Sequence, residues 1–380
     1  MLEGQTNIFE MLYPTFKIDK PIRLIELFGG YGSQALALKY LGADFEHWKL
    51  CEWAVKSIQA YKDIHFPEDN TDYSKDLNKA QLQEYLFSKG ISQNYNVPMT
   101  REQINRLKED NLRTIYNNIQ ATHNLVNIQQ VKGQDLEITN TDIYIYILTY
   151  SFPCQDLSVA GLGKGMSDTS TRSGMLWEVE RILTECQELG KFPQVLLMEN
   201  VPQVKTNDPS AWEKWLCRLE EFGYKNYHQD LIATDYGIPQ TRNRTFMVSI
   251  LGDYNYTFPK PIPLEKKLKD LLETNVDKKY YLSEKMLKGM LSSKFEQYRL
   301  ENRLQDIETN VDTLTTASGE RCPHCIPIKN ATEKGYLEAT DGDGIDISGR
   351  MQYHRGTVQK DKIQTLTCGG GRDLGVVINE

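Results

Sequence analysis

The sequence lacks the features of membrane proteins and of secreted, disulfide-stabilised proteins. None of its apolar runs approaches the roughly 20 residues that a transmembrane helix needs. The first ten residues, MLEGQTNIFE, lack the charged-then-apolar pattern of a signal peptide. Its seven cysteines are an odd number without framework spacing, which favours free thiols in a reducing compartment. We therefore expect a cytoplasmic protein.

An excess of positive charge is also absent. The 380 residues have a net charge of −8, whereas a nonspecific nucleic-acid-binding protein usually contains a basic domain. The negative charge is uneven along the chain. From Pro259 to the end, 19 basic residues balance 19 acidic ones, so the whole −8 arises from the first 258 residues. The charge therefore argues against a nonspecific nucleic-acid-binding protein, and the two parts of the chain differ in net charge.

Support for a metal site or for histidine chemistry is weak. The CPHC stretch at Cys322–Cys325 has no second cysteine pair at metal-ligand spacing, although Cys368 and His354 are available. The chain has only six histidines, and none adjoins the candidate catalytic residues named below. We therefore predict no metal site and no histidine-based mechanism.

Strands and helices alternate along the first 258 residues. A strand at residues 22–27 precedes the Gly-rich turn FGGYGSQ and a helix that Gly42 closes. Further strands are predicted for EHWKLCEW, DIYIYILTY, QVLLMEN and FMVSIL, and further helices for AVKSIQAYKDIHF and SAWEKWLCRLEEFGY. This alternation predicts an α/β fold with a parallel sheet and right-handed crossovers.

Two regions depart from this alternation. Residues from about 71 to 128 are polar, rich in Asn and Gln and helical in pattern, and they predict a helical insertion. Pro259, Pro261 and Pro263 predict a stiff linker. A smaller region with the helix SEKMLKGMLSSKFEQYRL and turns such as TDGDGIDISG follows. We therefore divide the chain into residues 1–258 and 259–380.

The turn after the first strand is suited to a ligand. Its glycines allow close approach of a ligand to the backbone, and the following helix offers free N–H groups. The third glycine of the dinucleotide pattern is missing, since Gly30 and Gly32 are followed by Ala35. Glu52, at the end of the next strand, is placed to bind ribose hydroxyls, and Trp53 to stack on adenine. A purely structural turn and core packing of Trp53 are the alternatives.

Cys154 directly follows Pro153 and lies a few residues after the strand DIYIYILTY. Open α/β sheets bind ligands at this carboxyl edge, but a reactive thiol also needs a lowered pKa or a positive neighbour. Glu199 ends another strand, and Arg242 and Arg244 alternate on a further one. A thiol, a carboxylate and two guanidiniums suit nucleophilic attack on a heterocycle that develops charge. An inert core cysteine and a solvated charged edge are the alternatives.

Taken together, these motifs resemble those of the C5-cytosine DNA methyltransferases of bacteria and phages. FGGYG, EW, GQDL, PCQDLSVAG, ENV and QTRNR occur in the order of that family between about Arg23 and Ile250. Each is modest alone, but the ordered combination is highly specific. The resemblance implies a Rossmann-like methyltransferase sheet with helices on both faces and a C-terminal target-recognition region. It also implies S-adenosylmethionine as methyl donor and double-stranded DNA as partner.

The resemblance implies a role for each matching residue at the target base. Cys154 would add to C6 of a flipped cytosine, and Glu199 would bind the N3 and amino edge of the base. Arg242 and Arg244 would hold the base and neighbouring phosphates. The base must leave the stack for this chemistry. The Gly/Ser-rich stretch DLSVAGLGKGMSDTSTRSG would close over the DNA.

The resemblance also implies a set of cofactor-binding residues. Glu52 would bind the ribose of S-adenosylmethionine, Trp53 the face of the adenine, and Asp135 its amino group. The residues that would line the rest of the cofactor are Phe28, Gly30 and Gly32.

Two departures from the family pattern stand out. The insertion lengthens the interval between Glu52 and Asp135, either as a surface decoration or as an extra contact for DNA or a partner. After QTLTCGGGRDLGVVINE we find no Arg-x-Leu-Thr segment and no Gly-Asn-Ser-rich piece. We therefore expect that a second polypeptide, a longer chain or the stretch NIFEMLYPTFK completes the cofactor site, and that the isolated chain methylates DNA poorly.

Three functions are compatible with these motifs. The main hypothesis is methylation of cytosine C5 in duplex DNA, for restriction–modification or host evasion in a bacterial cytoplasm or nucleoid. The second is a non-catalytic or partner-dependent DNA-binding remnant, although DNA binding alone needs no thiol at Cys154. The third is methylation of RNA by the same chemistry, which the region after Pro259 disfavours. No local rule decodes the recognised sequence.

Overall fold

The computed structural model describes residues 14–153 and 173–271, together with five short strands between residues 328 and 376. The chain divides into two compact units. The first contains Met1–Gln229 and Thr245–Phe258, and the second contains Asp230–Arg244 and Pro259–Glu380. The second unit therefore consists of the C-terminal part of the chain and of residues 230–244, which interrupt the first unit.

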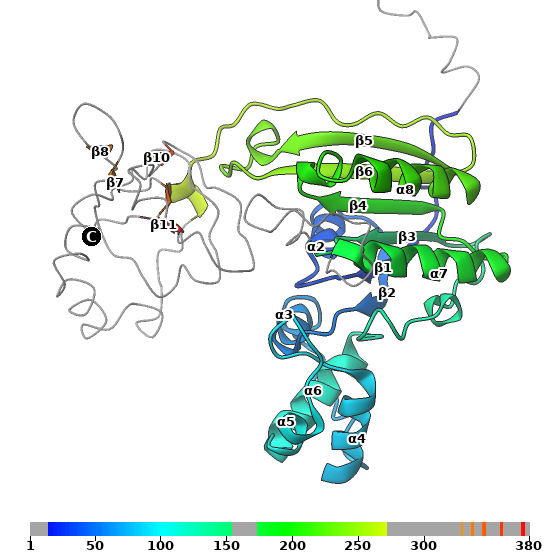
Figure 1. Ribbon diagram of the computed structural model, residues 1–380, viewed down its shortest axis with the longest axis vertical. Helices are drawn as coiled ribbons and strands as arrows, with labels where there is room; N and C mark the ends of the chain where they lie inside the picture. Colours follow the sequence, from blue (N-terminus) through cyan, green and yellow to red (C-terminus); the bar gives the residue numbers. More distant parts are fainter. Residues whose placement is uncertain are drawn as a thin grey trace, which may run out of the picture. The chain divides into compact units, whose positions relative to one another are not determined.

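A six-stranded sheet lies at the centre of the fold, in the strand order β2-β1-β3-β4-β6-β5 (Figure 1). Its strands are β1 (Ile22–Leu27), β2 (Phe45–Cys51), β3 (Ile145–Tyr150), β4 (Val195–Asn200), β5 (Tyr224–Ile232) and β6 (Asn243–Leu251). Strands β1 to β4 pair in parallel, as the alternation of strands and helices predicts.

The parallel prediction is wrong for β6, which pairs antiparallel with β4. Strand β5, at the edge of the sheet, was not predicted from the sequence at all. Between β5 and β6 the chain forms only the short 3-10 helix η4 (Ala233–Asp235). A parallel return needs a crossover of a dozen or more residues, usually a helix, so a short connection favours the antiparallel direction.

Helices cover both faces of the sheet, which confirms the α/β class. On one face, α7 (Leu176–Glu188) and α8 (Pro209–Glu221) pack against β3 and β4. On the other face, α2 (Ser33–Tyr40) packs through Ala35. Alternate residues of each strand point to opposite faces. In β1, for example, Leu24 belongs to the core under α2 and Ile25 to the core under α7 and α8.

The helical insertion is present and has a core of its own. After α3 (Val55–His65), it contains α4 (Lys79–Lys89), α5 (Arg101–Asn105) and α6 (Glu109–Ala121), which extend away from the sheet in Figure 1. Its apolar side chains recur at helical spacing. The buried ones include Leu82, Leu86, Ile104, Leu112, Ile115 and Ile119.

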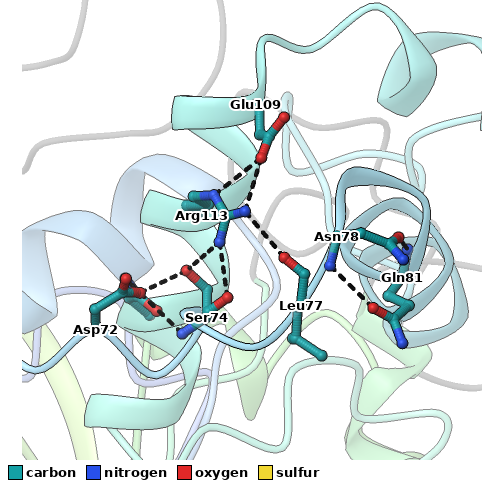
Figure 2. A network of polar contacts seen from close by, with 8 residues as sticks. Asp72, Ser74, Leu77, Asn78, Gln81, Glu109 and Arg113 are labelled. Atoms are coloured by element: carbon teal, nitrogen blue, oxygen red, sulfur yellow. Dashed lines mark hydrogen bonds and ion pairs between the residues drawn. The ribbon is translucent and has the colours of Figure 1, made fainter.

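One arginine connects α6 to the chain that leads into α4 (Figure 2). The guanidinium of Arg113 donates to the backbone oxygen of Ser74 at 2.7 Å and to that of Leu77 at 2.9 Å. It also pairs with Glu109, one turn earlier on α6, at 2.7 Å. These partners all lie within the insertion, so this network stabilises the insertion itself.

In the second unit, the predicted linker is itself hydrogen-bonded to the segment of residues 230–244. The amide of Ile262 donates to the oxygen of Asp235 at 2.8 Å, and the Tyr236 hydroxyl donates to the oxygen of Pro259 at 3.1 Å. The short 3-10 helix η5 (Leu268–Leu271) ends this part. The proline-containing segment is therefore fixed at two points rather than free.

Five short strands form two small antiparallel sheets further along the second unit. One has the order β10-β9-β11 and the other consists of β7 and β8. The strands are β7 (Ile328–Lys329), β8 (Tyr336–Leu337), β9 (Gly344–Asp346), β10 (Val358–Gln359) and β11 (Leu374–Val376). The predicted helix SEKMLKGMLSSKFEQYRL and the CPHC stretch lie outside the described residues.

Candidate active site

The carboxyl ends of the four parallel strands meet at one edge of the sheet. Leu27, the last residue of β1, pairs with Cys51 of β2 on one side and with Tyr150 of β3 on the other. Tyr150 in turn pairs with Met198 of β4. The glycine turn, Glu52, the segment that leads to Cys154, and Glu199 all follow directly from these positions. This is the edge at which open α/β sheets bind ligands.

The glycine turn after β1 has an unusual backbone. Phe28, Gly30 and Gly32 have φ angles of 56°, 57° and 81°, in the left-handed region. For Phe28 this is strained, at about 1–3 kcal/mol, and such strain clusters at ligand sites. A Cβ built on Gly30 has no atom within 4 Å, so the backbone there borders open space. A Cβ on Gly32 would overlap the rings of Tyr61 and His65.

A buried carboxyl group supports this turn from beneath. Glu26, inside β1, accepts hydrogen bonds from the Tyr61 hydroxyl at 2.6 Å and from the Ala35 amide of α2 at 3.3 Å. Burial raises its pKa to about 7, although both hydrogen bonds oppose the shift. Glu26 was not among the site residues predicted from the sequence. The signal was available, because a carboxylate inside the apolar run RLIELF needs a buried partner.

Two histidines extend this buried group. The Nδ1 atom of His47 lies 2.8 Å from the Tyr61 hydroxyl, and Nε2 of His65 lies 2.9 Å from the backbone oxygen of Tyr31 in the turn. Burial and the neighbouring His65 and Lys39 lower the pKa of His47 to about 4, so this ring is neutral at pH 7. The α3 side chains thus contact the turn directly, a role that the sequence did not indicate.

Glu52 connects the end of β2 to the glycine turn. Its carboxylate accepts hydrogen bonds from the amides of Gly30 at 2.9 Å and Ala54 at 2.8 Å, one on each oxygen. The side chain is buried, with 7% of the residue exposed, and burial raises its pKa against the opposing effect of these amides. The Trp53 amide also interacts with this carboxylate. A carboxylate has about four acceptor sites, so capacity remains for a further hydrogen bond from a ligand.

The other two predicted cofactor residues lie in different surroundings. Trp53 is partly buried and packs against the core of the insertion, as the packing alternative expected. Asp135 lies in the 3-10 helix η1 (Gly133–Leu136), where one carboxylate oxygen accepts from the Lys132 amide at 2.9 Å. In the part of the chain that the structure describes, no hydrogen bond joins Asp135 to Glu52 or Trp53.

Cys154 and all but the last two residues of the Gly/Ser-rich stretch after it lie outside the described residues, but the chain up to Pro153 is described. Asn200, at the end of β4, donates from Nδ2 to the backbone oxygen of Phe152 at 3.1 Å. Its Oδ1 accepts from the Val201 amide at 2.8 Å, and the residue is almost fully buried. The asparagine of ENV therefore holds the backbone two residues before Cys154 next to the strand end of the half-buried Glu199.

Arg242 and Arg244 belong to the second unit. Strand β6 begins at Asn243, so only Arg244 lies within it. Arg244 is 7% exposed and donates to the backbone oxygen of Asn243 at 2.7 Å. Arg242 is half-buried, and its backbone oxygen accepts from the Ala233 amide at 2.9 Å. The two guanidiniums therefore differ in burial, and a fully solvated charged edge does not describe Arg244.

Residues 14–153 and 173–271 and the short strands contain neither a cluster of metal ligands nor a membrane-spanning helix. There, no group of three or more His, Cys, Asp and Glu side chains is placed to hold a metal ion. No helix in these ranges is long and apolar enough to cross a membrane.

Comparison with known proteins gave consistent matches. The family model described as C-5 cytosine-specific DNA methylase matches residues 99–367. The orphan methyltransferase M.SssI of Spiroplasma monobiae is 37% identical over 269 residues, which cover 70% of this chain and 68% of that protein. The type II methyltransferase M2.ScrFI of Lactococcus lactis subsp. cremoris is 35% identical over 271 residues, which cover 69% and 70%. The solved structure of S. pombe Dnmt2 methyltransferase aligns with a TM-score of 0.45 and 15% identity, over 88% of this chain and 80% of that one.

Proposed function

Since the chain belongs to the family of C-5 cytosine-specific DNA methyltransferases, we propose that Cys154 is the nucleophile that activates cytosine for methylation in duplex DNA. The observation that supports this most is the bond from Asn200 to the oxygen of Phe152. It holds the chain before Cys154 beside the end of β4, where Glu199 lies. A thiol and a carboxylate from adjacent parallel strand ends suit attack on one flat base.

We assign the cofactor site to the glycine turn and Glu52. Bound there, S-adenosylmethionine would supply an electrophilic methyl group. The described residues fit this ligand, because Gly30 borders open space and the Glu52 carboxylate, which interacts with three backbone amides, keeps acceptor capacity for a ribose hydroxyl. Phe28 and Gly32 shape the turn, the exposed part of Trp53 suits adenine, and Asp135 retains one carboxylate oxygen for an amino group.

In the proposed reaction, the Cys154 thiolate adds to C6 of a cytosine flipped out of the helix. The new C6–S bond would release the C5–C6 electron pair to C5, which would take the methyl group. The electron pair of the broken methyl–sulfur bond would stay with the sulfur, and S-adenosylhomocysteine would leave. Glu199 binds the N3 and amino edge and stabilises the charge that develops in the ring. A base then removes the C5 proton, the C6–S bond breaks, and the thiolate returns.

Target recognition is assigned to residues 259–380, and catalysis to residues 1–258. Arg242 and Arg244 would bind the flipped base and neighbouring phosphates. We propose a role in restriction–modification or host evasion for this activity. The need for a second polypeptide stays a prediction.

Bisulfite sequencing of DNA from a host without cytosine methylation tests this function. Expression of the chain should protect a fraction of the cytosines at one recurring sequence from conversion, since a methylated C5 resists deamination and the isolated chain is expected to methylate poorly. Empty vector is the control. If soluble, folded chain is present and every cytosine converts, the isolated chain is not an active methyltransferase. Protection in RNA but not in DNA would reassign the substrate.

A further inference from the structure

The helical insertion is bonded to the backbone of Glu52 through one buried asparagine. Asn124 follows α6, at the end of the insertion, and is 6% exposed. Its Oδ1 accepts from the amide of Glu52 at 3.1 Å, and its Nδ2 donates to the oxygen of Glu52 at 2.9 Å. One side chain therefore satisfies both backbone polar groups of the residue assigned to the ribose.

The course of the surrounding backbone explains why a side chain, and not the backbone, bonds to Glu52. Residues 123–125 run beside β2 as a short parallel bridge, with Leu125 donating to the oxygen of Leu50 at 2.7 Å. The chain then turns away at Val126, whose φ of 72° is rare for a β-branched residue. The side-chain amide of Asn124 extends these contacts from Leu50 to Glu52, two residues further along, and its Oδ1 also accepts from the Val126 amide at 2.9 Å. Such a strained turn persists only where its surroundings enforce it.

A second part of the insertion binds the next residues of the same segment. The amide of Ser92, just after α4, donates to the oxygen of Trp53 at 2.7 Å. The oxygen of Ser92 accepts from the Val55 amide at 2.9 Å. The backbone that presents Glu52 and Trp53 is thus bonded to the insertion at two separate places. A surface decoration would not be built into the sheet edge in this way.

We infer that Asn124 is a positioning residue for the cofactor site, and that the insertion holds Glu52 and Trp53 in place to bind S-adenosylmethionine. The inference rests on the proposed role of Glu52. Asn124 acts through Glu52: it fixes the backbone from which the carboxylate reaches the Gly30 amide. Without Asn124, the Glu52 carboxylate has no defined position, and the entropic cost of ordering it weakens ligand binding.

The test compares two buried asparagines of the insertion. Asn118, also 6% exposed, bonds the side chain of Gln59 at 2.8 Å and has no bond to Glu52. Calorimetric titration of the full chain with S-adenosylmethionine should show about tenfold weaker binding for Asn124→Ala, as expected for lost hydrogen bonds. Asn118→Ala should remain within twofold of the wild type. With unmethylated DNA, Asn124→Ala should raise KM for S-adenosylmethionine by a similar factor, with kcat and KM for DNA within twofold.

Two further variants keep the outcome decisive. Asn124→Asp keeps the size of the side chain and the oxygen that accepts from the Glu52 amide, but it loses the Nδ2 donor to the Glu52 oxygen. If Asn124→Ala does not fold, Asn124→Asp is measured in its place. It should bind the cofactor more weakly than Asn118→Ala. Equal affinities for the Asn124 and Asn118 variants, beside a weakened Glu52→Ala, would overturn the inference alone. A Glu52→Ala variant with wild-type affinity would instead overturn the proposed cofactor site.

Discussion

The carboxylates at the sheet accept hydrogen bonds from neutral donors, whereas a carboxylate in the insertion pairs with an arginine. Glu26 and Glu52, at the sheet, are buried and accept hydrogen bonds from a tyrosine hydroxyl and from backbone amides. In the insertion, Glu109 is exposed and pairs with Arg113. In both sheet residues burial raises the carboxyl pKa. A carboxylate that remains buried with only neutral donors is unfavourable for stability, and such groups are found at functional sites.

This difference distinguishes a structural network in the insertion from a group of carboxylates that supports the candidate site. Arg113 satisfies backbone oxygens and closes the insertion upon itself, which is a structural role. Glu52 and Glu26 hold a strained turn that borders open space. Perturbing the sheet edge should therefore alter ligand binding and chemistry, whereas perturbing the Arg113 network should alter stability alone.

The largest expected effect follows from Cys154→Ser. A serine hydroxyl is far less ionised than a thiol at neutral pH, so C6 addition should fail and methyl transfer should be abolished. Transfer of tritiated methyl groups to unmethylated DNA measures this, and calorimetry should show that S-adenosylmethionine still binds. The matched control is Cys217→Ser, which changes an exposed cysteine of α8. Normal turnover by Cys154→Ser would remove the nucleophile assignment.

A pH-dependent effect on stability is expected for Glu26→Gln. The Glu26 carboxyl has a pKa of about 7 in the fold, above its ordinary value of 4.5. Stabilisation by its proton is therefore complete below pH 4.5 and lost as pH rises through 7. The 2.5-unit difference between those values corresponds to about 3 kcal/mol. Glutamine cannot ionise, so the variant should gain stability relative to the wild type between pH 4.5 and 8.

Urea unfolding at several pH values measures this difference. Subtracting the two curves removes groups common to both proteins, including His47, whose lowered pKa acts in the opposite direction. A difference that does not change with pH would mean that Glu26 is ionised in the fold with an ordinary pKa.

A smaller effect is expected for Glu52→Ala. The loss of a charged acceptor for ribose hydroxyls should weaken S-adenosylmethionine binding by roughly 1.5–3 kcal/mol. Calorimetry measures the affinity, and Glu84→Ala, in the exposed pair with Arg101, is the control. Unchanged affinity in Glu52→Ala would place the ribose elsewhere.

The smallest effect concerns the insertion. Arg113→Ala removes bonds to two backbone oxygens and should lower the free energy of unfolding by about 1–3 kcal/mol. Its KM for DNA should not change, because the network lies within the insertion (Figure 2). Thermal unfolding and steady-state kinetics check both statements. Arg101→Ala, which removes an exposed ion pair with Glu84 and an exposed contact with the Phe87 ring, should lower Tm less than Arg113→Ala. A raised KM for DNA in Arg113→Ala would instead indicate a DNA contact.

Much of the fold could be predicted from local patterns. The apolar runs that became β1, β3 and β4 and the helical spacing of α8 are local signals, and they were interpreted correctly. Strand β5 was missed because YKNYHQDLI is polar along much of its length and lies at the sheet edge, where no alternation of buried residues is required. The direction of β6 was missed because pairing depends on the length of a connection and not on the strand itself.

The sequence by itself determined the alternating α/β order, the helical insertion and the motifs that identify the family, because these depend on short-range spacing. Only the tertiary structure decided which distant residues support the site. Glu52 lies 72 positions from Asn124, and Glu26 lies 35 positions from Tyr61. No local pattern links such pairs. They become partners because parallel strands bring their carboxyl ends to one edge, where buried polar groups must find donors and acceptors among their neighbours.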